Sequence, residues 1–310
     1  MTNVPHPNRL RGVLSPVVTP FDRELRPDAE RFIQHCRWLL EQGAGLAVFG
    51  TTSEANSLSL AEKSALLDTL IAAGIPPERI MAGTGCCAFP DTTELTRHAV
   101  RLGCAGVLML PPFYYKAVSD EGLFRSYANV IERVGDSRLR IYLYHIPPVS
   151  QVPISLALIE RLLKAYPGTI AGIKDSSGDW NNMRAMLEQF QPHGFDVFSG
   201  TESFLLAILR GGGAGCITAT ANVNPGSIAQ LAHSWQQPEA DAQQTSLNSV
   251  RQVFQQFPTI PALKATIADY SDDARWLTVR PPLVELDDEQ RGALGRSLHA
   301  LDFSMPGLRA

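Results

Sequence analysis

Short β-branched runs alternate with amphipathic segments along most of this chain, and the alternation restricts the fold more than any other feature. In parallel sheets, each strand is followed by a helix that covers the sheet and leads to the next strand. The sequence predicts eight strands, over residues 13–19, 45–49, 80–83, 106–110, 140–144, 169–173, 196–199 and 215–219. It predicts eight helices after them, over 28–42, 60–73, 91–102, 119–134, 155–166, 179–190, 202–210 and 225–235. Several of these helices begin with a capping side chain, namely Asp91, Ser119, Ser155 and Asp179.

Eight successive strand–helix units predict an α/β fold of the (β/α)8 TIM-barrel type. The main competitor is a doubly wound open sheet, which requires a glycine-rich phosphate turn after its first strand. Residues 15–21, Ser-Pro-Val-Val-Thr-Pro-Phe, contain no glycine. After Trp235 the pattern is helical only, over 240–257, 261–270 and 287–300, with a break at Pro281-Pro282. We therefore predict a catalytic barrel over residues 1–236 and a C-terminal helical subdomain over 237–310.

Composition and charge exclude several classes of protein. The formal net charge of the 310 residues is −4 without long runs of one sign, which argues against nucleic-acid and anionic-membrane partners. No stretch approaches the roughly 20 apolar residues of a membrane span. Residues 1–11 are polar and contain prolines, unlike the apolar centre of a signal peptide, so we expect a cytoplasmic protein.

The chain contains five cysteines, at positions 36, 86, 87, 104 and 216. Their spacings match no zinc motif, and a chain of this length does not need a disulfide framework. We expect reduced thiols that pack in the interior. Cys86-Cys87 follows a glycine turn, so a position near a functional site stays open for this pair.

Lys174 is the residue that best indicates chemistry. It follows the β-branched run 169–173 and precedes the turn residues 175–178, which places an amine at the mouth of a buried strand. Burial disfavours a charged amine, and a neutral amine attacks carbonyl groups to form a Schiff base. The alternative is a strand-end lysine that extends to solvent or pairs with Asp175.

The residues that follow the other predicted strands support the chemical interpretation. In a barrel of this type, the C-terminal ends of all strands meet at one rim, where the active site lies. Hydroxyls, phenols and one amine are predicted at that rim, without a carboxylate cluster or a histidine set. No metal is therefore expected. This combination is typical of a carbonyl-binding amine with hydroxyl groups that relay protons.

Four short motifs resemble those of a known superfamily. They are Gly50-Thr51-Thr52-Ser53-Glu54, Tyr144 before Ile146-Pro147, Gly172-Ile173-Lys174, and Gly215-Cys216-Ile217. In this order and spacing the chain resembles the pyruvate-dependent class I aldolases and lyases, which include dihydrodipicolinate synthase and N-acetylneuraminate lyase. The resemblance covers nearly the whole chain.

The resemblance implies a role for each matching residue. Lys174 would form the Schiff base with pyruvate or another 2-keto acid, and Tyr144 would shuttle protons. Thr51 would link Tyr144 into a hydroxyl relay, Thr52 would hold the keto-acid carboxylate, and Ile217 would add a backbone contact. The alternatives are an aromatic cap on the barrel for Tyr144, and turn or helix-capping roles for the two threonines.

The resemblance also implies a homotetramer, built as a dimer of dimers, in which a tyrosine after the fourth strand enters the neighbouring subunit's site. Two residues compete for that role. Alignment on Pro112 favours Tyr114, whereas the distance back from residues 121–123 favours Tyr115, and we favour Tyr114. Packing in a dimer interface is the alternative role for either tyrosine.

Departures from the family pattern bear on the substrate. Val149 occupies the place of the arginine that grips the second substrate's carboxylate in the synthase, and valine cannot make that contact. Ser53 replaces a glycine that is usual in the threonine motif, which reshapes that loop slightly. Ala219 falls where N-acetylneuraminate lyase carries a hydroxyl group. The synthase and the sialic acid lyase are both disfavoured.

The remaining pattern looks most like that of 2-keto-3-deoxy sugar acid aldolases. Ser176, Gly200 and Glu202 are candidate contacts for a substrate polyol, and His145 is either a substrate contact or a packed strand-end histidine. We expect a class I aldolase that cleaves a 2-keto-3-deoxy sugar acid, or a related 4-hydroxy-2-oxo acid, to pyruvate and an aldehyde. No cofactor is expected. A dehydratase of the same fold, the synthase itself and a non-catalytic keto-acid binding protein are the alternatives.

Overall fold

The computed structural model describes residues 9–308. The strands are β1 (Gly12–Ser15), β2 (Gly45–Leu46), β3 (Met81–Gly83), β4 (Gly106–Met109), β5 (Ile141–His145), β6 (Ile170–Asp175), β7 (Asp196–Ser199) and β8 (Gly215–Ile217). The helices between and after them are α1 (Ala29–Glu41), α2 (Leu60–Ala72), α3 (Phe89–Arg101), α4 (Asp120–Val134), α5 (Pro147–Ser150), α6 (Leu156–Ala165), α7 (Trp180–Phe190), α8 (Leu205–Arg210) and α9 (Pro225–Ser234). Three more helices follow, α10 (Ala240–Phe254), α11 (Thr259–Ser271) and α12 (Asp288–His299).

The residues group into two compact units, each made of two stretches of chain. The first unit contains the segment up to Arg11 and Pro76–Cys216, and the second contains Gly12–Ile75 and Ile217–Ala310. The boundary between a barrel and a helical subdomain after residue 236 stays a prediction. Most of the polar segment 1–11 lies outside the described residues. Within residues 9–308, none of the helices is both long and apolar enough to cross a membrane.

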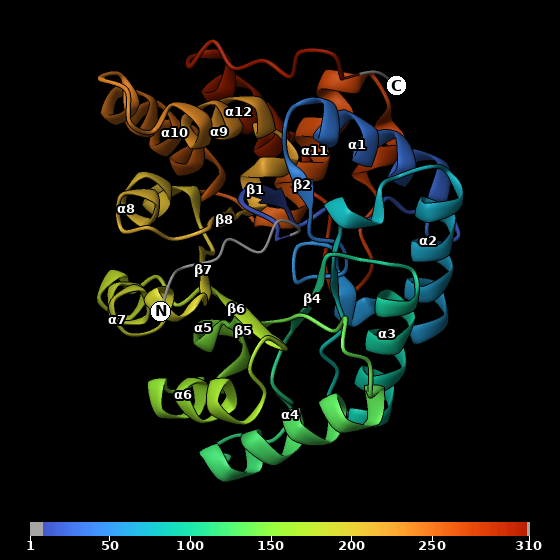
Figure 1. The fold of residues 1–310 in the computed structure, drawn as a ribbon. Helices are drawn as coiled ribbons and strands as arrows, with labels where there is room; N and C mark the ends of the chain where they lie inside the picture. The colour runs from blue at the N-terminus through green and yellow to red at the C-terminus, as the bar shows by residue number, and fades with distance from the viewer. Residues whose placement is uncertain (1–8, 309–310) are drawn as a thin grey trace. The chain divides into compact units, whose positions relative to one another are not determined.

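Strands β3 to β8 follow one another in chain order and pair in parallel. All of them lie in the first unit except the last residue of β8, Ile217. Figure 1 shows β5, β6 and β7 as neighbours. Nearly every residue of these strands is buried. Strands of a parallel sheet are buried on both faces, which explains why the middle residues of these strands are apolar and do not alternate with polar residues.

Tyr142 of β5 fills the space beside two glycines on the neighbouring strands. A Cβ atom at Gly106 of β4 would lie 2.8 Å from the Tyr142 ring, and one at Gly172 of β6 would lie 2.9 Å from it. The ring also packs edge-on against Phe198 of β7, with 5.8 Å between centroids. The Tyr142 hydroxyl donates to Asp196, which also pairs with arginine side chains from the N-terminal segment. Tyr142 and its neighbours therefore form a packed layer beneath Tyr144 and Lys174, which lie two residues further along β5 and β6.

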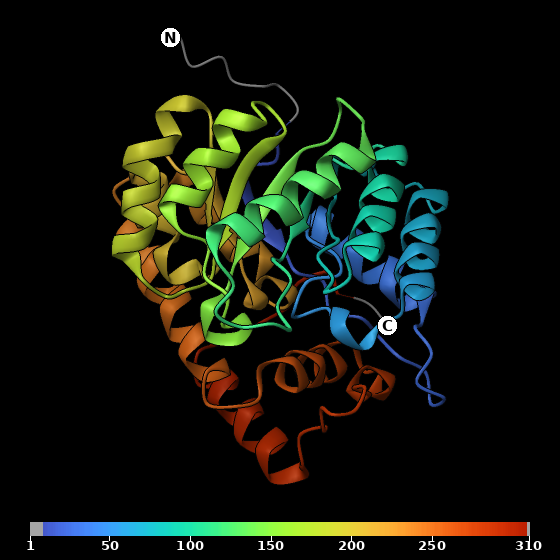
Figure 2. The same ribbon diagram turned by 90° about the horizontal axis from the view of Figure 1, so that it is seen from below.

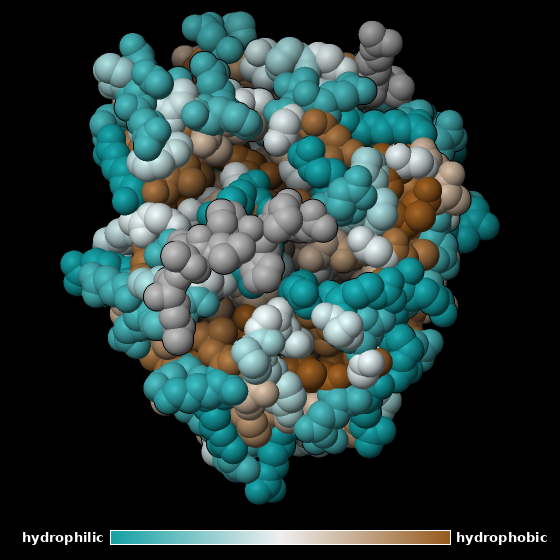
Figure 3. Space-filling view, viewed as in Figure 1, coloured by the Kyte–Doolittle hydropathy of each residue, from teal (hydrophilic) through white to brown (hydrophobic). Residues whose placement is uncertain are grey.

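The second unit contains the parallel pair β1 and β2, the helices α1 and α2, and the C-terminal helices α9 to α12. Helices α10, α11 and α12 pack against one another, and they form the orange and red part of Figure 2. Most of α11 is buried, including Lys264, which has no exposed surface. The outward side of α10 is hydrophilic in Figure 3. A helix that is buried nearly all round explains the long apolar run at 260–268.

Most element boundaries agree with the sequence prediction, and the differences have local causes. The caps predicted at Ser119, Ser155 and Asp179 accept backbone hydrogen bonds as expected. The cap predicted at Asp91 is wrong: α3 begins at Phe89, and Asp91 lies in its first turn. The sequence analysis does not predict the four-residue helix α5, which begins with Pro147-Pro148. Proline is accepted in a first helical turn, where its missing N–H is not needed. Strand β6 extends beyond the predicted residue 173.

Candidate active site

Lys174 and Tyr144 lie side by side on adjacent strands of the first unit. Tyr144 of β5 pairs in register with Lys174 of β6, which pairs in turn with Phe198 of β7. The Lys174 Nζ donates a hydrogen bond to the Tyr144 hydroxyl over 3.3 Å and lies 4.4 Å from the centre of the Tyr144 ring. Both side chains are buried, with 4% and 3% of their surface exposed. The structure therefore places a buried amine against a phenol.

His145 and Asp175 come next on the same two strands and face the opposite side of the sheet, because successive side chains of a strand alternate. The His145 Nδ1 accepts the Ile154 backbone N–H over 3.0 Å, so a neutral ring carries its proton on Nε2. Burial lowers the pKa of His145, although the Asp175 charge opposes this shift. This arrangement favours the packing alternative for His145, and a contact with substrate stays a prediction.

Asp175 organises the loops that follow β6 and β7. Its carboxylate accepts hydrogen bonds from the Ser177 backbone and the Asn182 side chain, each over 2.7 Å. Its carbonyl oxygen accepts the Gly200 N–H over 2.6 Å. The alternation of side chains places Asp175 on the opposite face from Lys174, which argues against the ion pair considered from the sequence.

Ser176 and Gly200, two of the predicted substrate contacts, are packed against each other. A Cβ atom at Gly200 would lie 2.0 Å from the Ser176 Oγ, so only glycine allows this approach. Glu202 follows after one residue and is 1% exposed at the start of a short 3-10 helix. Thr201 caps that helix by accepting the Ser203 N–H over 3.2 Å. The loop after β7 therefore places a buried carboxylate at the same end of the strands as Lys174.

Tyr114 and Tyr115 lie on the loop after β4 and are the most exposed aromatic residues of the described chain, at 74% and 73%. Their rings pack edge to face, with 5.3 Å between centroids. The Lys116 ammonium donates to the carbonyl oxygens of Phe113 and Ser150, which fastens the loop to α5. Val149 of α5 is 63% exposed. The structure does not decide between the two tyrosines.

The threonine motif forms a tight loop after β2 in the second unit. The Ser53 Oγ accepts the Gly50 N–H over 3.2 Å, and the Thr19 hydroxyl donates to the Ser53 carbonyl oxygen over 2.8 Å. Thr51 and Thr52 are half-buried at its tip. Ile217 of the same unit is the last residue of β8 and is fully buried. The structure thus joins Lys174 to Tyr144 in the first unit, whereas Thr51, Thr52 and Ile217 belong to the second.

Metal-ligating clusters and disulfides do not occur in the described part of the chain. No group of three histidine, cysteine, aspartate or glutamate side chains within residues 9–308 is arranged to hold a metal ion. All five cysteines are free thiols, and Cys36 and Cys216 are buried. Burial raises the pKa of Cys104 to about 12, which makes this thiol a poor nucleophile near neutral pH.

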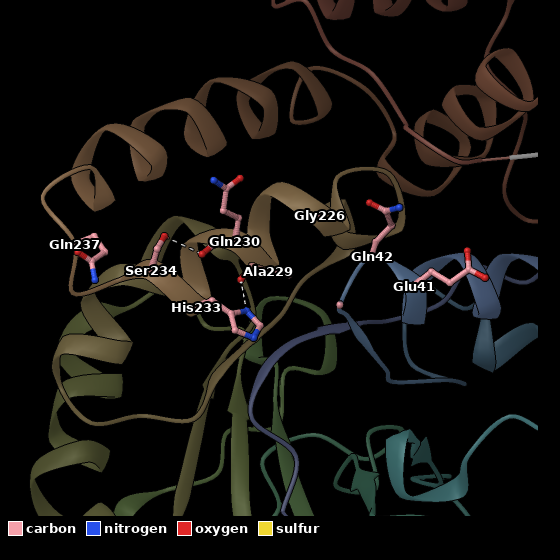
Figure 4. Close-up of a pocket in the computed structure, with 9 residues that line it drawn as sticks. Glu41, Gln42, Gly226, Ala229, Gln230, His233, Ser234 and Gln237 are labelled. Carbon is pink, nitrogen blue, oxygen red and sulfur yellow. Dashed lines mark hydrogen bonds between the residues drawn. The ribbon is translucent and has the colours of Figure 1, made fainter.

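An open surface pocket of about 440 Å³ lies away from these residues, between the end of α1 and helix α9 (Figure 4). Its walls include Gln42, Gln230, His233 and Ser234. The His233 ring and the Ser234 hydroxyl bond to carbonyl oxygens of their own helix, at 2.8 Å and 2.9 Å. His233 and Ser234 are therefore engaged within α9. The pocket is located next to the start of β2, not at the end of a strand.

Comparison with known proteins defines the class. The family model described as "Dihydrodipicolinate synthetase family" matches residues 9–301. The chain is 33% identical over 287 residues to a DapA-like lyase of Chloroflexus aurantiacus, which covers 92% of this chain and 94% of that protein. The chain belongs to the dihydrodipicolinate synthetase family, a family of lyases.

Solved structures agree with this assignment. Dihydrodipicolinate synthase from Agrobacterium tumefaciens is 32% identical, with a TM-score of 0.87 and coverage of 94% of this chain and 99% of that one. YagE of E. coli K12, a prophage protein of the same family in complex with pyruvate, is 25% identical, with a TM-score of 0.85 and coverage of 94% and 99%. The predicted (β/α)8 barrel is confirmed, and so is the superfamily that the sequence motifs indicated.

Proposed function

We propose that this protein is a class I aldolase that cleaves a 2-keto-3-deoxy sugar acid, or a related 4-hydroxy-2-oxo acid, to pyruvate and an aldehyde. The observation that carries the proposal is the buried Lys174 amine, 3.3 Å from the Tyr144 hydroxyl on the neighbouring strand. Family membership and the pyruvate bound to YagE support it. A protein that only bound keto acids would not need an amine buried beside a proton donor.

The reaction that we propose begins when the Lys174 Nζ attacks the C2 carbonyl of the substrate, and water leaves as the imine forms. The C4 hydroxyl then loses its proton while the C3–C4 bond breaks. The bonding electrons move into the protonated imine, which yields an enamine and releases an aldehyde. Protonation at C3 and hydrolysis by water return pyruvate and the free amine. No further oxidant or reductant is needed.

In this mechanism Tyr144 is the group that moves protons at the imine and at the C4 oxygen. A tyrosine is a weak base in water, so it needs help from a local network. We propose that Thr51 and Tyr114 provide this relay, as the family resemblance implies. Thr52 and the Ile217 backbone would hold the keto-acid carboxylate.

The proposed substrate carries a polyol chain at the position where the substrate of the synthase carries a second carboxylate. The loops after β6 and β7 carry the Ser176 and Glu202 side chains, which suit hydroxyl groups, and we propose Gly200 as a backbone contact beside them. Val149 presents an exposed apolar surface where an arginine would be needed. A dihydrodipicolinate synthase is the second candidate, because the Agrobacterium tumefaciens relative carries that name. The Val149 position argues against it.

We also propose a cytoplasmic homotetramer, arranged as a dimer of dimers. The support in this chain is the pair Tyr114 and Tyr115, about three-quarters exposed on one loop. Such a pair of aromatic rings is more typical of a protein interface than of a free surface.

The test of the proposed function is reductive trapping. The protein is incubated with pyruvate and borohydride, and the modified peptide is located by mass spectrometry. We expect one reduced pyruvate adduct, on Lys174. Lys264 provides an internal comparison, because it is also buried yet pairs with Glu54, and it should stay unmodified. The Lys174→Ala variant should fold and give no adduct.

If the parent protein formed no reduced pyruvate adduct, or formed it on a residue other than Lys174, the Schiff-base proposal would be overturned. Product analysis then separates the remaining alternatives. An aldolase releases pyruvate and an aldehyde in equal amounts, whereas a dehydratase returns an uncleaved deoxy keto acid. Condensation of pyruvate with aspartate semialdehyde would identify the synthase.

A further inference from the structure

In the second unit, a buried cluster of charged side chains surrounds Glu54, the last residue of the threonine motif. The Lys264 ammonium of α11 forms an ion pair with the Glu54 carboxylate, and the two side chains are 0% and 1% exposed. The other Glu54 carboxylate oxygen accepts the Arg280 backbone N–H over 2.9 Å. The Lys264 ammonium also donates to the Thr278 carbonyl oxygen over 2.8 Å. Both oxygens of Glu54 are therefore held by the C-terminal part of the chain.

An aromatic ring and a second ion pair complete this cluster. The Lys264 ammonium and the Arg280 guanidinium lie 4.4 Å and 4.6 Å from the centre of the Phe21 ring. The Arg280 guanidinium bonds to the Ser57 carbonyl oxygen over 2.5 Å and pairs with Glu62 of α2. Burial lowers the pKa of Lys264 to about 8, and the negative charge of Glu54 opposes this shift. Loss of that carboxylate would leave a buried cation without its partner.

The loop that Glu54 ends has an unusual backbone. Phe49 and Glu54, at the two ends of the Gly50–Ser53 turn, both adopt left-handed conformations, with φ of 60° and 56°. Residues with a Cβ atom avoid this region, and they persist in it only where the surroundings fix them. Strained positions of this kind gather at functional sites. Within this loop the Glu54 N–H also bonds to the Thr51 carbonyl oxygen over 3.1 Å.

We propose that Lys264 and the Arg280 backbone are positioning residues, which hold Glu54 and thereby keep the Thr51–Thr52 loop in its keto-acid-binding conformation. The proposal rests on the proposed function, in which Thr52 holds the substrate carboxylate. Glu54 is the link, because it is three residues from Thr51 and anchored by α11. The C-terminal helices would thus contribute to substrate binding without contacting the substrate.

The test compares three variants with a destabilised control. Glu54→Gln keeps the size of the side chain but removes its charge, and Lys264→Met removes the ammonium. A variant that leaves one buried charge unpaired is strongly destabilised and can fail to fold. The double variant Glu54→Gln/Lys264→Met leaves no unpaired charge and keeps the test decisive. Leu70→Ala, at a fully buried position of α2 in the same unit, controls for loss of stability alone.

Two readouts separate positioning from stability. The first is the pyruvate concentration at half-maximal borohydride trapping of Lys174, which should rise about 10- to 100-fold in the three variants, because misplaced binding groups cost this much. The maximal extent of trapping should be unchanged. The second is hydrogen–deuterium exchange of residues 50–58, which should accelerate in the same variants. Leu70→Ala should lower the melting temperature without changing either readout.

Each outcome decides a different claim. Unchanged half-saturation and unchanged loop exchange in a folded variant would overturn the positioning role. If Leu70→Ala changed the half-saturation and the loop exchange equally, the cluster would only stabilise the fold, and the positioning role would be overturned as well. If the parent protein is not trapped by pyruvate, the proposed function fails. In that case the hydrogen–deuterium exchange of residues 50–58 still shows whether Lys264 and Glu54 hold the threonine loop.

Discussion

Tyr144 can be tested by the removal of one oxygen atom. Tyr144→Phe keeps the ring against Lys174 but removes the hydroxyl that accepts the amine's hydrogen bond. A positioned proton-transfer group contributes about 10²- to 10⁴-fold to rate, so we expect kcat for aldol cleavage to fall within that range. Imine trapping by borohydride should continue at a lower rate. Steady-state kinetics and mass spectrometry measure the two effects, and a kcat within twofold of the parent would refute a role in proton transfer.

Some residues of the site could be predicted from the sequence because the information is local. Tyr144 and Lys174 are at corresponding positions of consecutive strands, β5 and β6, and consecutive strands of a barrel are neighbours. The sequence pattern predicts a strand that ends at residue 144, one residue before β5 ends, so it does not indicate which way His145 faces. Lys264 was missed because its partner Glu54 is 210 residues away. A single cation within the apolar run 260–268 was the available signal.

At the scale of one strand, Gly172 of β6 has no room for a side chain. The Cβ atom of an alanine there would lie 2.3 Å from the Asp196 carbonyl oxygen and 2.9 Å from the Tyr142 ring. Backbone on β7 cannot yield easily, so we expect Gly172→Ala to lower the free energy of unfolding by about 1–3 kcal/mol. Urea denaturation measures this change.

Gly122→Ala is the matched control in the same unit. Gly122 lies in α4, and the nearest atom to a new Cβ there is 3.6 Å away. Replacing a helical glycine with alanine should stabilise the protein by about 0.5–1 kcal/mol. Equal destabilisation by both substitutions would show that close strand packing at Gly172 is not the cause.

The start of α2 carries a pH-dependent contribution to stability. Glu62 lies in the first turn of α2, and the hydrogen bond from the Arg280 side chain lowers the pKa of the Glu62 carboxyl from 4.5 to about 2. A carboxyl group whose folded pKa is depressed stabilises the fold above its unfolded pKa, and this contribution is lost as the pH falls from about 4.5 to about 2. Because Glu62 is partly solvent-screened, we expect only about 1 kcal/mol.

Urea denaturation of the parent and of Glu62→Gln tests this contribution. Near neutral pH the variant should be less stable by about 1 kcal/mol, and the difference should shrink as the pH falls from about 4.5 to about 2 and disappear below that, where the parent carboxyl is protonated in the folded protein too. A difference that is independent of pH would assign the effect to packing and not to charge.

The elements themselves were largely predictable, since periodicity and capping residues act over a few positions. Ser119 and Ser155 begin helices as their side chains indicate, because each accepts an N–H of the first turn. The first turn of α3 contains Pro90, which fits helix starts, and the polar Asp91 concealed this signal. The predicted strands 13–19 and 45–49 extend beyond the ends of β1 and β2, because the apolar residues that follow these strands are buried in loops.

At the scale of the whole molecule, the fold class followed from the count and order of elements. Eight strand–helix units leave few topologies, because parallel crossovers are right-handed and consecutive strands are adjacent. The residues that hold the threonine loop could not be found in this way. Lys264 and Arg280 come from the helical part after β8, and their contact with Glu54 depends on how α11 packs within the second unit.

Assembly is the property of the whole molecule that Tyr114 and Tyr115 are expected to control. Both rings are about three-quarters exposed in the single chain, and burying an aromatic side chain stabilises a contact by about 1.5–3 kcal/mol. Removing both rings by Tyr114→Ala/Tyr115→Ala should therefore weaken subunit association by about 10²-fold or more. Sedimentation velocity over a dilution series measures the loss.

The single variants distinguish catalysis from assembly. If Tyr114 completes the proton relay of a neighbouring site, Tyr114→Ala should lower kcat by about 10²-fold or more, even at concentrations where the oligomer persists. Tyr115→Ala should then weaken association with a smaller effect on kcat, and the reverse pattern would assign the relay to Tyr115. The double variant should lose activity in parallel with dissociation. A monomer with full activity would contradict both roles, because each chain would then complete its own site.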